Sequence, residues 1–124
     1  MSQKRILIVD DEKDLVDMLK LRLEAAGYEI LEAYDGQEGL EKAKDEKPDL
    51  ILLDLMLPKM DGYQLCRILK FDEDYKHIPI IMLTARAQQQ DKQQGTTCGA
   101  DEYVTKPFEP KELLSVIQKH IKDT

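Results

Sequence analysis

The chain has 124 residues, a length that suits one domain with a single core, and we expect one unit over residues 1–124 without an output domain. Its 25 acidic and 18 basic residues give a formal net charge of -7, and it has no block of Lys or Arg to contact nucleic-acid phosphates. No apolar run approaches the roughly 18 residues of a membrane span, and the amino terminus lacks the apolar region of a signal peptide. These features argue against direct nucleic-acid binding and membrane insertion, and they predict a cytoplasmic protein.

The first third of the chain alternates between apolar strands and helical patterns. Ile6–Val9 is fully apolar and predicts a buried strand. Glu12–Ala26 carries apolar residues at helical spacing until Gly27, a residue typical of the position after a helix. Glu29–Ala33 predicts a second strand, and its two Glu residues are typical of an edge strand. A turn at residues 35–36 then begins a second helix.

The central stretch, Pro48–Pro58, contains an apolar run with no polar alternation. Such a run is typical of a strand that is buried on both faces at the centre of a parallel sheet. Asp54 ends the run, where a buried carboxylate is costly unless the chain needs it at the carboxyl edge of the sheet. Open α/β sheets bind their ligands at that edge, so Asp54 is the first candidate for a functional residue.

The second half of the chain repeats the alternation. Residues 63–71 predict a helix, Ile78–Leu83 a fourth strand and Glu102–Thr105 a fifth, and Pro110 fits the first turn of a last helix. Gln88–Cys98 should form the remaining helix, although its Gly and Thr residues have low helix propensity. The sequence therefore predicts an α/β fold with a doubly wound, five-stranded parallel sheet of the flavodoxin-like (βα)5 type and strand order 2-1-3-4-5.

Polar side chains stand at the carboxyl ends of four predicted strands. They comprise two carboxylates after the first strand, one after the third, a hydroxyl after the fourth and an ammonium after the fifth: Asp10, Asp11, Asp54, Thr84 and Lys106. Taken singly, each of them also suits a helix cap or a solvated surface position. Because the carboxyl ends of these strands surround the switch point of a doubly wound sheet, the set as a whole indicates a site.

The chemistry of this set favours phosphoryl transfer. Clustered carboxylates repel one another unless a cation neutralises them, and oxygen ligands select a hard ion such as Mg²⁺, so we interpret Asp10 and Asp11 as metal ligands. A carboxylate beside that ion can attack a phosphoryl group, and Asp54, from the central strand, is the candidate. Lys106 and Thr84 would supply the cation and the hydrogen-bond donor that the phosphoryl charge requires.

Five motifs in order resemble the receiver domain of two-component response regulators, and the likeness covers nearly the whole chain. Around Asp54 the sequence is most similar to the receivers of winged-helix transcription regulators. Each motif alone is weak, whereas five at matching spacing are specific. The motifs are Val9–Glu12, Leu53–Pro58 with Met60–Gly62, Leu83–Ala85, Gly99–Tyr103 and Lys106–Phe108.

The resemblance implies a role for each site residue. Asp54 would be the phosphoacceptor, and it would hold Mg²⁺, or Mn²⁺ as an alternative, together with Asp10, Asp11 and the backbone carbonyl of Met56. Thr84 and Lys106 would contact the phosphoryl oxygens. Tyr103 would swing inward with Thr84 as the switch, and the Lys106–Pro107 bond would be cis.

The resemblance also implies partners. A sensor histidine kinase or phosphotransfer protein would dock on the first helix, near Lys13–Met18, and on the loop at Pro107–Phe108. A downstream target or a second copy of the chain would bind the face made of the fourth helix, the fifth strand and the last helix. The domain would not be an enzyme, because it would assist only its own phosphorylation and dephosphorylation.

Three other functions share parts of this pattern. A haloacid-dehalogenase-like phosphatase uses an Asp nucleophile with Mg²⁺, but it needs a second Asp two residues later, where this chain has Met56. A flavodoxin-like flavin carrier would need a first loop that accepts phosphate, and Asp10–Glu12 would repel it. An interaction module that works without phosphorylation would not need the complete acidic set with Thr84 and Lys106.

Overall fold

The computed structural model describes residues 3–85 and 98–121, in which five strands form one parallel sheet. Their order, β2-β1-β3-β4-β5, confirms the predicted doubly wound sheet. In the register of the sheet, Val9 lies beside Leu53, and Asp54 lies beside Leu83. The strands are β1 Arg5–Val9, β2 Glu29–Ala33, β3 Leu50–Asp54, β4 Ile80–Ala85 and β5 Glu102–Lys106.

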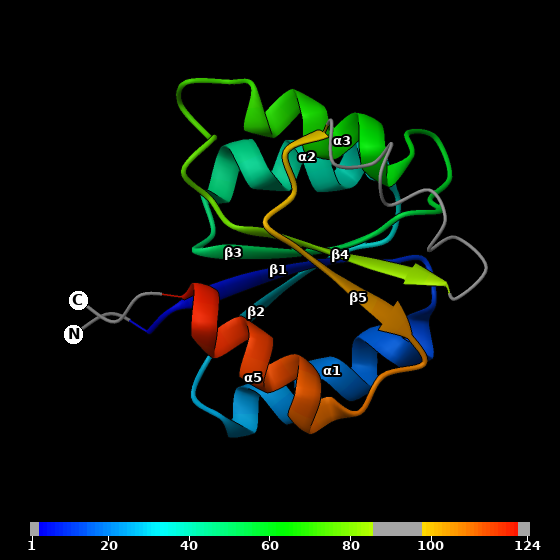
Figure 1. Cartoon of the computed structure of the whole chain (residues 1–124), viewed down its shortest axis with the longest axis vertical. Helices are drawn as coiled ribbons and strands as arrows, with labels where there is room; N and C mark the ends of the chain where they lie inside the picture. Colours follow the sequence, from blue (N-terminus) through cyan, green and yellow to red (C-terminus); the bar gives the residue numbers. More distant parts are fainter. Residues whose placement is uncertain (1–2, 86–97, 122–124) are drawn as a thin grey trace.

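Four helices in the described residues cover both faces of the sheet (Figure 1). They are α1 Lys13–Ala25, α2 Gly36–Glu46, α3 Gly62–Lys70 and α5 Pro110–His120. α2 and α3 lie on one face, and α1 and α5 lie on the other. The helix predicted over Gln88–Cys98 lies outside the described residues apart from Cys98. Among the helices that the structure describes, none is long and apolar enough to cross a membrane.

The central strand β3 is buried on both faces, which explains its unbroken apolar sequence. Leu50 and Leu52 belong to the core that contains the buried side chains of α1 and α5. Ile51 and Leu53 belong to the core that contains those of α2 and α3. Successive side chains of a strand point to opposite faces, so a strand between two helical layers needs an apolar residue at every position.

The helix starts differ in how they are capped. Asp35 accepts a hydrogen bond from the backbone N–H of Glu38 at 2.8 Å, and the Glu38 side chain accepts one from the N–H of Tyr34 at 2.7 Å, so both side chains bond backbone N–H groups at the start of α2. Asp61 caps α3 through a bond of 2.9 Å. The N-cap residue of α1, Glu12, makes no side-chain capping bond. Its carboxylate contacts a lysine at the end of β5 instead.

Several element ends differ from those that the sequence indicated, and among them β4 begins at Ile80 and not at Ile78. β4 ends at Ala85 and β5 at Lys106, so Thr84 and Lys106 lie inside strands and not after them. The cause is continued pairing, because Thr84 is still paired with Thr105 and Ala85 with Lys106. Ala26, which the helical spacing places on the buried stripe of the first helix, is exposed because it is the C-cap residue.

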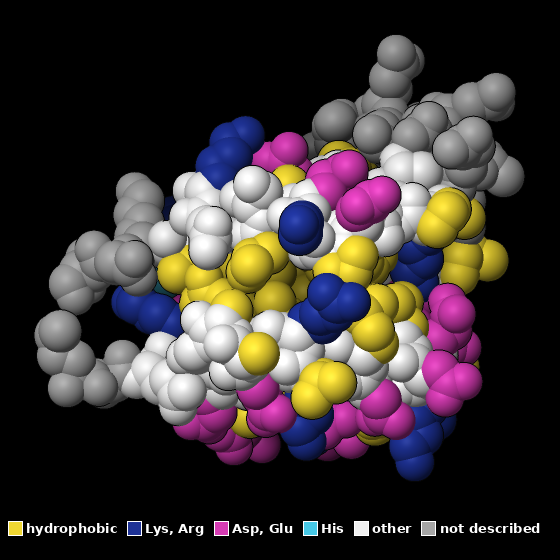
Figure 2. All heavy atoms as spheres, turned by 90° about the horizontal axis from the view of Figure 1, so that it is seen from below, with side chains coloured by type: hydrophobic (Ala, Val, Ile, Leu, Met, Phe, Trp, Pro, Cys, Tyr) yellow, Lys and Arg dark blue, Asp and Glu magenta, His cyan; other side chains and the backbone are white. Residues whose placement is uncertain are grey.

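The α1/α5 face carries a groove. Figure 2 shows hydrophobic side chains gathered in a strip on this face, with Lys and Arg side chains beside them. The groove has a volume of about 320 Å³, and its lining includes Leu19, Leu23, Leu113 and Leu114 together with Arg22 and Lys111. The two helices therefore leave part of their apolar surface uncovered.

Candidate functional site

Strand periodicity brings three charged side chains to one side of the sheet edge. In β1, β3 and β5, the side chains of Ile8, Leu52 and Val104 belong to the core on the α1/α5 side. Side chains two positions apart in a strand share a face. The next residues on that face stand at the carboxyl ends of the three strands, and they are Asp10, Asp54 and Lys106.

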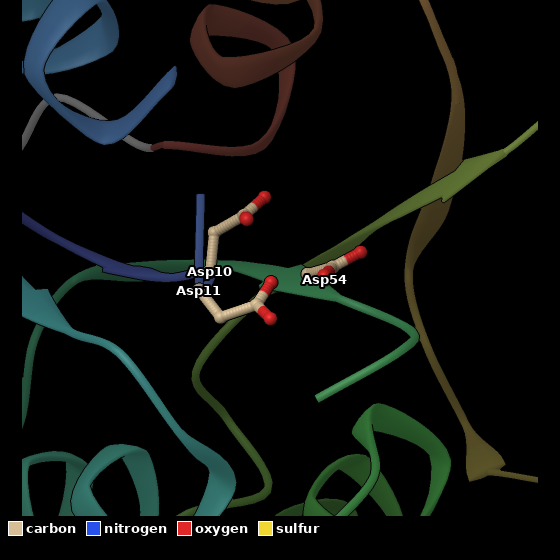
Figure 3. Close-up of side chains that lie close together, drawn as sticks. All are labelled: Asp10, Asp11 and Asp54. Atoms are coloured by element: carbon tan, nitrogen blue, oxygen red, sulfur yellow. The ribbon is translucent and has the colours of Figure 1, made fainter. Parts of the chain in front are cut away.

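Asp10, Asp11 and Asp54 form a carboxylate cluster (Figure 3). Each contributes one oxygen atom, and these atoms lie within 4.8 Å of one another. Asp10 and Asp54 are buried, whereas Asp11 is exposed. Figure 3 shows Asp10 and Asp11 after the end of β1, and Asp54 at the end of β3. Since three carboxylates this close repel one another and offer only oxygen atoms, the cluster fits a hard divalent cation such as Mg²⁺.

Lys106 brings a positive charge to this cluster. Its Nζ donates to Asp10 at 2.8 Å, to Glu12 at 3.1 Å and to Asp54 at 3.4 Å. Burial opposes the charge of this lysine, but the hydrogen bond to Asp10 and the charges of Asp10 and Asp54 outweigh it and raise the pKa of Lys106. One ammonium group thus serves three carboxylates, and its contact with Asp54 is the longest.

Asp54 holds a proton more tightly than an ordinary Asp. Burial, followed by the charge of Asp10, raises the pKa of Asp54 to about 6, and the opposing effect of Lys106 is smaller. The residue is only 7% exposed. Ionised Asp54 therefore raises the free energy of the folded protein unless a cation compensates its charge.

Thr84 brings a buried hydroxyl to the same edge from β4. It follows Leu83, which pairs with Asp54, and it is 1% exposed. In the part of the chain that the structure describes, its Oγ1 has no hydrogen-bond partner. An unpaired buried hydroxyl costs about 1–3 kcal/mol, so an acceptor that reached this atom would stabilise the protein.

Tyr103 lies on the α2/α3 side of the sheet. It pairs with Met82 of β4 and packs against the core on that side. Its hydroxyl is 3.9 Å from Sγ of Cys98. Thr84 stands two positions after Met82 in the same strand, so Thr84 and Tyr103 share one side of the sheet. The two predicted switch residues are therefore on the opposite side from the α1/α5 core.

Gly62 holds the loop after Asp54 against the strand end. Its N–H donates to the carbonyl of Leu55 at 2.8 Å. A Cβ atom at position 62 would lie 2.3 Å from the carbonyl oxygen of Asp54, so only glycine allows this approach. Within the loop the side chain of Met56 is 64% exposed, and its carbonyl oxygen stays a predicted metal ligand.

The loop after Lys106 forms a second groove with α1. The Lys106–Pro107 peptide bond is cis, as the resemblance implies. The groove has a volume of about 410 Å³ and connects the charged site with apolar side chains of α1. Its lining residues are Glu12, Leu15, Met18, Lys106, Pro107 and Phe108.

Comparison with known proteins identifies the family. The family model described as "Response regulator receiver domain" matches residues 6–118. The chain belongs to the response regulator receiver family. Over 124 residues the receiver is 50% identical to the phosphate regulon transcriptional regulatory protein PhoB of Pseudomonas aeruginosa, which covers 100% of this chain and 54% of PhoB. It spans about half the length of the curated relatives it matches.

Solved structures agree with this family. A putative response regulator from Chloroflexus aurantiacus superposes on the receiver with a TM-score of 0.91 at 38% identity, covering 97% of this chain and 98% of the other. The receiver domain of the sensor histidine kinase PA1611 from Pseudomonas aeruginosa gives a TM-score of 0.88 at 32% identity, covering 97% and 98%. That structure has a magnesium ion in its active site cleft. The predicted family and fold are therefore confirmed, and the receiver is a signalling domain of two-component systems.

Contacts that the sequence did not predict include one at the site and one at β5. Glu12 contacts Lys106, although its sequence context did not predict a role in the site. Its place before a helix, where Glu is a poor cap, is the one sequence signal that points to another use. His120 lies 2.7 Å from Glu102, a contact between α5 and β5 that lowers the pKa of Glu102, and nothing in the spacing indicates this pair.

Proposed function

We propose that this receiver accepts a phosphoryl group on Asp54 from a sensor histidine kinase or a phosphotransfer protein. The position of Asp54 carries the proposal. Its buried carboxylate shares a cluster with Asp10 and Asp11 and lies 3.4 Å from Nζ of Lys106. The unpaired hydroxyl of Thr84 belongs to the same edge and offers a donor that a phosphoryl oxygen would satisfy.

Each of these residues has a separate role in the proposed reaction. A carboxylate oxygen of Asp54 attacks phosphorus and forms an acyl phosphate, while the bond from phosphorus to the donor breaks and its electron pair leaves with the donor. With a pKa of about 6, Asp54 is mostly ionised at neutral pH, as a nucleophile must be. Lys106 and Thr84 donate hydrogen bonds to the phosphoryl oxygens and stabilise their charge.

A divalent cation belongs to this proposal. Held by Asp10, Asp11, Asp54 and the carbonyl of Met56, it would neutralise the carboxylates and the phosphoryl oxygens. The receiver domain of PA1611 coordinates magnesium in its active site cleft, and the ligand set here suits Mg²⁺, with Mn²⁺ as an alternative. The domain catalyses only its own phosphorylation and dephosphorylation and does not turn over an external substrate.

The partners are also proposed. The groove between α1 and Pro107–Phe108 would seat the kinase or phosphotransfer protein, since it connects apolar surface with the reacting site. The output would leave through Thr84 and Tyr103 to the face of the fourth helix, β5 and α5, where a downstream target or a second copy binds. We place this domain in the cytoplasm, without direct contact of residues 1–124 to nucleic acid.

Mass spectrometry tests the proposal directly. Protein incubated with Mg²⁺ and a small-molecule phosphodonor should gain one phosphoryl group, and Asp54→Asn should gain none. Asp45→Asn, which removes an exposed carboxylate of α2, is the matched control and should gain as much as the wild type. An equal gain in Asp54→Asn would refute the acceptor. Steady hydrolysis of phosphate esters would favour the phosphatase alternative instead.

A further inference from the structure

We propose that Glu12 is a positioning residue, which holds Lys106 while Asp54 is unphosphorylated and releases it when Asp54 carries a phosphoryl group. This inference rests on the proposed function and extends it to a residue outside the predicted site. It starts from one contact, in which Oε1 of Glu12 accepts a hydrogen bond from Nζ of Lys106 at 3.1 Å.

The backbone of Glu12 is fixed on both sides. Its N–H donates to Oδ1 of Asp10 at 2.9 Å, and its carbonyl accepts the N–H of Val16 at 3.0 Å, which begins α1. The side chain makes no capping bond at this N-cap position. It therefore links the start of α1 to Lys106 of β5 and adds nothing to the cap of its own helix.

The hydrogen bonds of Lys106 are fully used in this arrangement. An ammonium group has three N–H donors, and Asp10, Glu12 and Asp54 supply three acceptors. A phosphoryl oxygen on Asp54 would be a further acceptor of high charge. Phosphorylation also removes the charge of the Asp54 carboxylate, so Lys106 has to turn from that oxygen toward the phosphoryl oxygen, and its contacts with Asp10 and Glu12 compete with this movement.

Exposure decides which contact ends most easily. Of the two carboxylates that keep their charge, the side chain of Asp10 is 0% exposed, whereas that of Glu12 is 64% exposed. A buried carboxylate that loses its partner pays the full cost of desolvation, while an exposed one is solvated by water at once. Glu12 is therefore the partner that Lys106 leaves, and the strength of that contact sets how readily Lys106 moves.

The release of Lys106 from Glu12 predicts that a Glu12 variant should favour the phosphorylated state. A variant without the Glu12 carboxylate leaves Lys106 with one competitor fewer, so the state with an occupied phosphoryl position should be favoured. Because an exposed ion pair is weak, the effect should be about threefold in affinity for a phosphoryl analogue. If Glu12 acted only through its negative charge, the affinity for the analogue would not depend on the length of its side chain. Glu12→Asp would then bind the analogue like the wild type.

The contact itself can be tested without metal or phosphoryl group. In a double-mutant cycle, Glu12→Gln and Lys106→Met are made singly and together, and the urea midpoint of each metal-free protein is measured. Glu12→Gln should shift the midpoint downward more in the presence of Lys106 than in the Lys106→Met background. Asp14→Asn, which removes an exposed charge from the first turn of α1, should shift it equally in both backgrounds. Equal shifts for Glu12→Gln would overturn the proposal.

The consequence is tested with beryllofluoride as phosphoryl analogue at saturating Mg²⁺. Glu12→Gln should bind it about threefold more tightly than the wild type, and Glu12→Asp, which keeps the charge but shortens the reach, should show the same direction. Asp14→Asn should bind like the wild type. Unchanged affinity in Glu12→Gln, or wild-type affinity in Glu12→Asp, would overturn the release mechanism. A wild type that binds no analogue would instead overturn the proposed function and this role with it, whatever the cycle shows.

Discussion

Two lysines at opposite ends of the sheet show how differently a largely buried ammonium group can be used. Lys70, at the end of α3, is 12% exposed, and Lys106 is 18% exposed. Lys70 donates to two backbone carbonyl groups and to Oδ2 of Asp101, at 2.9–3.0 Å. Asp101 also accepts the N–H of Ile80 at 2.8 Å. One carboxylate thus balances one ammonium group. Their contacts join the end of α3 to the segment before β4, to the first residue of β4 and to the residue before β5.

Lys106 also makes three contacts, but all three acceptors are carboxylates. Asp11 adds a fourth acidic group nearby. The negative charge therefore exceeds what one lysine compensates, and a buried hydroxyl at the same edge of the sheet, that of Thr84, lacks a partner in the described residues. The Lys70 region is complete as it stands, whereas the Lys106 region is suited to a cation and an anion that arrive from solution.

The largest expected effect of a substitution is at Lys70. Lys70→Met should lower the free energy of unfolding by about 3 kcal/mol, because Asp101 loses its counter-charge and two carbonyl groups lose the ammonium donor in a partly buried place. Urea unfolding measures it. The control is Lys76→Met, which breaks only the exposed pair with Glu73 and should cost less than about 1 kcal/mol. If Lys70→Met unfolds at the urea concentration of the wild type, the contacts of Lys70 do not stabilise the fold as predicted.

The second effect is a pH dependence of stability that comes from the Lys106 region, through Asp54. Folding raises the pKa of Asp54 to about 6, so between roughly pH 4 and 6 the native state binds more protons than the unfolded one. Its contribution to stability is present below this window and is lost as the pH rises through it. In metal-free protein, Asp54→Asn should therefore gain stability relative to the wild type by about 2 kcal/mol between pH 4 and 7.5.

Urea midpoints across this pH range, with buffers of constant ionic strength, provide the measurement. The exposed Asp45→Asn variant should follow the wild type at every pH. A difference between Asp54→Asn and wild type that does not change with pH would show that Asp54 is not the strained carboxylate.

The smallest of the three effects concerns Asp11. Removing one charge from the cluster should raise the stability of metal-free protein, but Asp11 is exposed, so the gain in Asp11→Asn should be only about 1 kcal/mol. Thermal unfolding with and without Mg²⁺ measures it, and Mg²⁺ should stabilise the wild type far more than the variant. A variant that melts lower without metal and still responds fully to Mg²⁺ would contradict the site.

The sequence predicted the elements that depend on periodicity. The unbroken apolar run at Leu50–Leu53 indicated a strand buried on both sides, and the structure confirms it. The same periodicity predicts that Asp10, Asp54 and Lys106 lie close together, because the strand ends of a parallel sheet share one edge. The ends of β4 and β5 were placed too early, since a polar side chain at a strand end does not stop backbone pairing.

The ion pairs were not predictable in the same way. Glu12 and Lys106 are 94 residues apart, and Lys70 and Asp101 are 31 apart. A charged side chain on the surface fits many positions, so its residue type alone does not select a partner. The members of these pairs meet only in the folded sheet. The pairing of β5 with β4 brings Lys106 to the carboxyl edge, where Glu12 lies. The end of α3 lies at the amino ends of the same two strands, which brings Lys70 to Asp101.

Gly62 has a consequence for saturation mutagenesis of this receiver. It has no functional group, yet a methyl group there would collide with the carbonyl oxygen of Asp54. A library scored for signalling should therefore lose nearly every substitution at position 62, as it would at Asp54, the proposed acceptor. A library scored only for folding would separate them, because Asp54→Asn should survive that selection and Gly62→Ala should not.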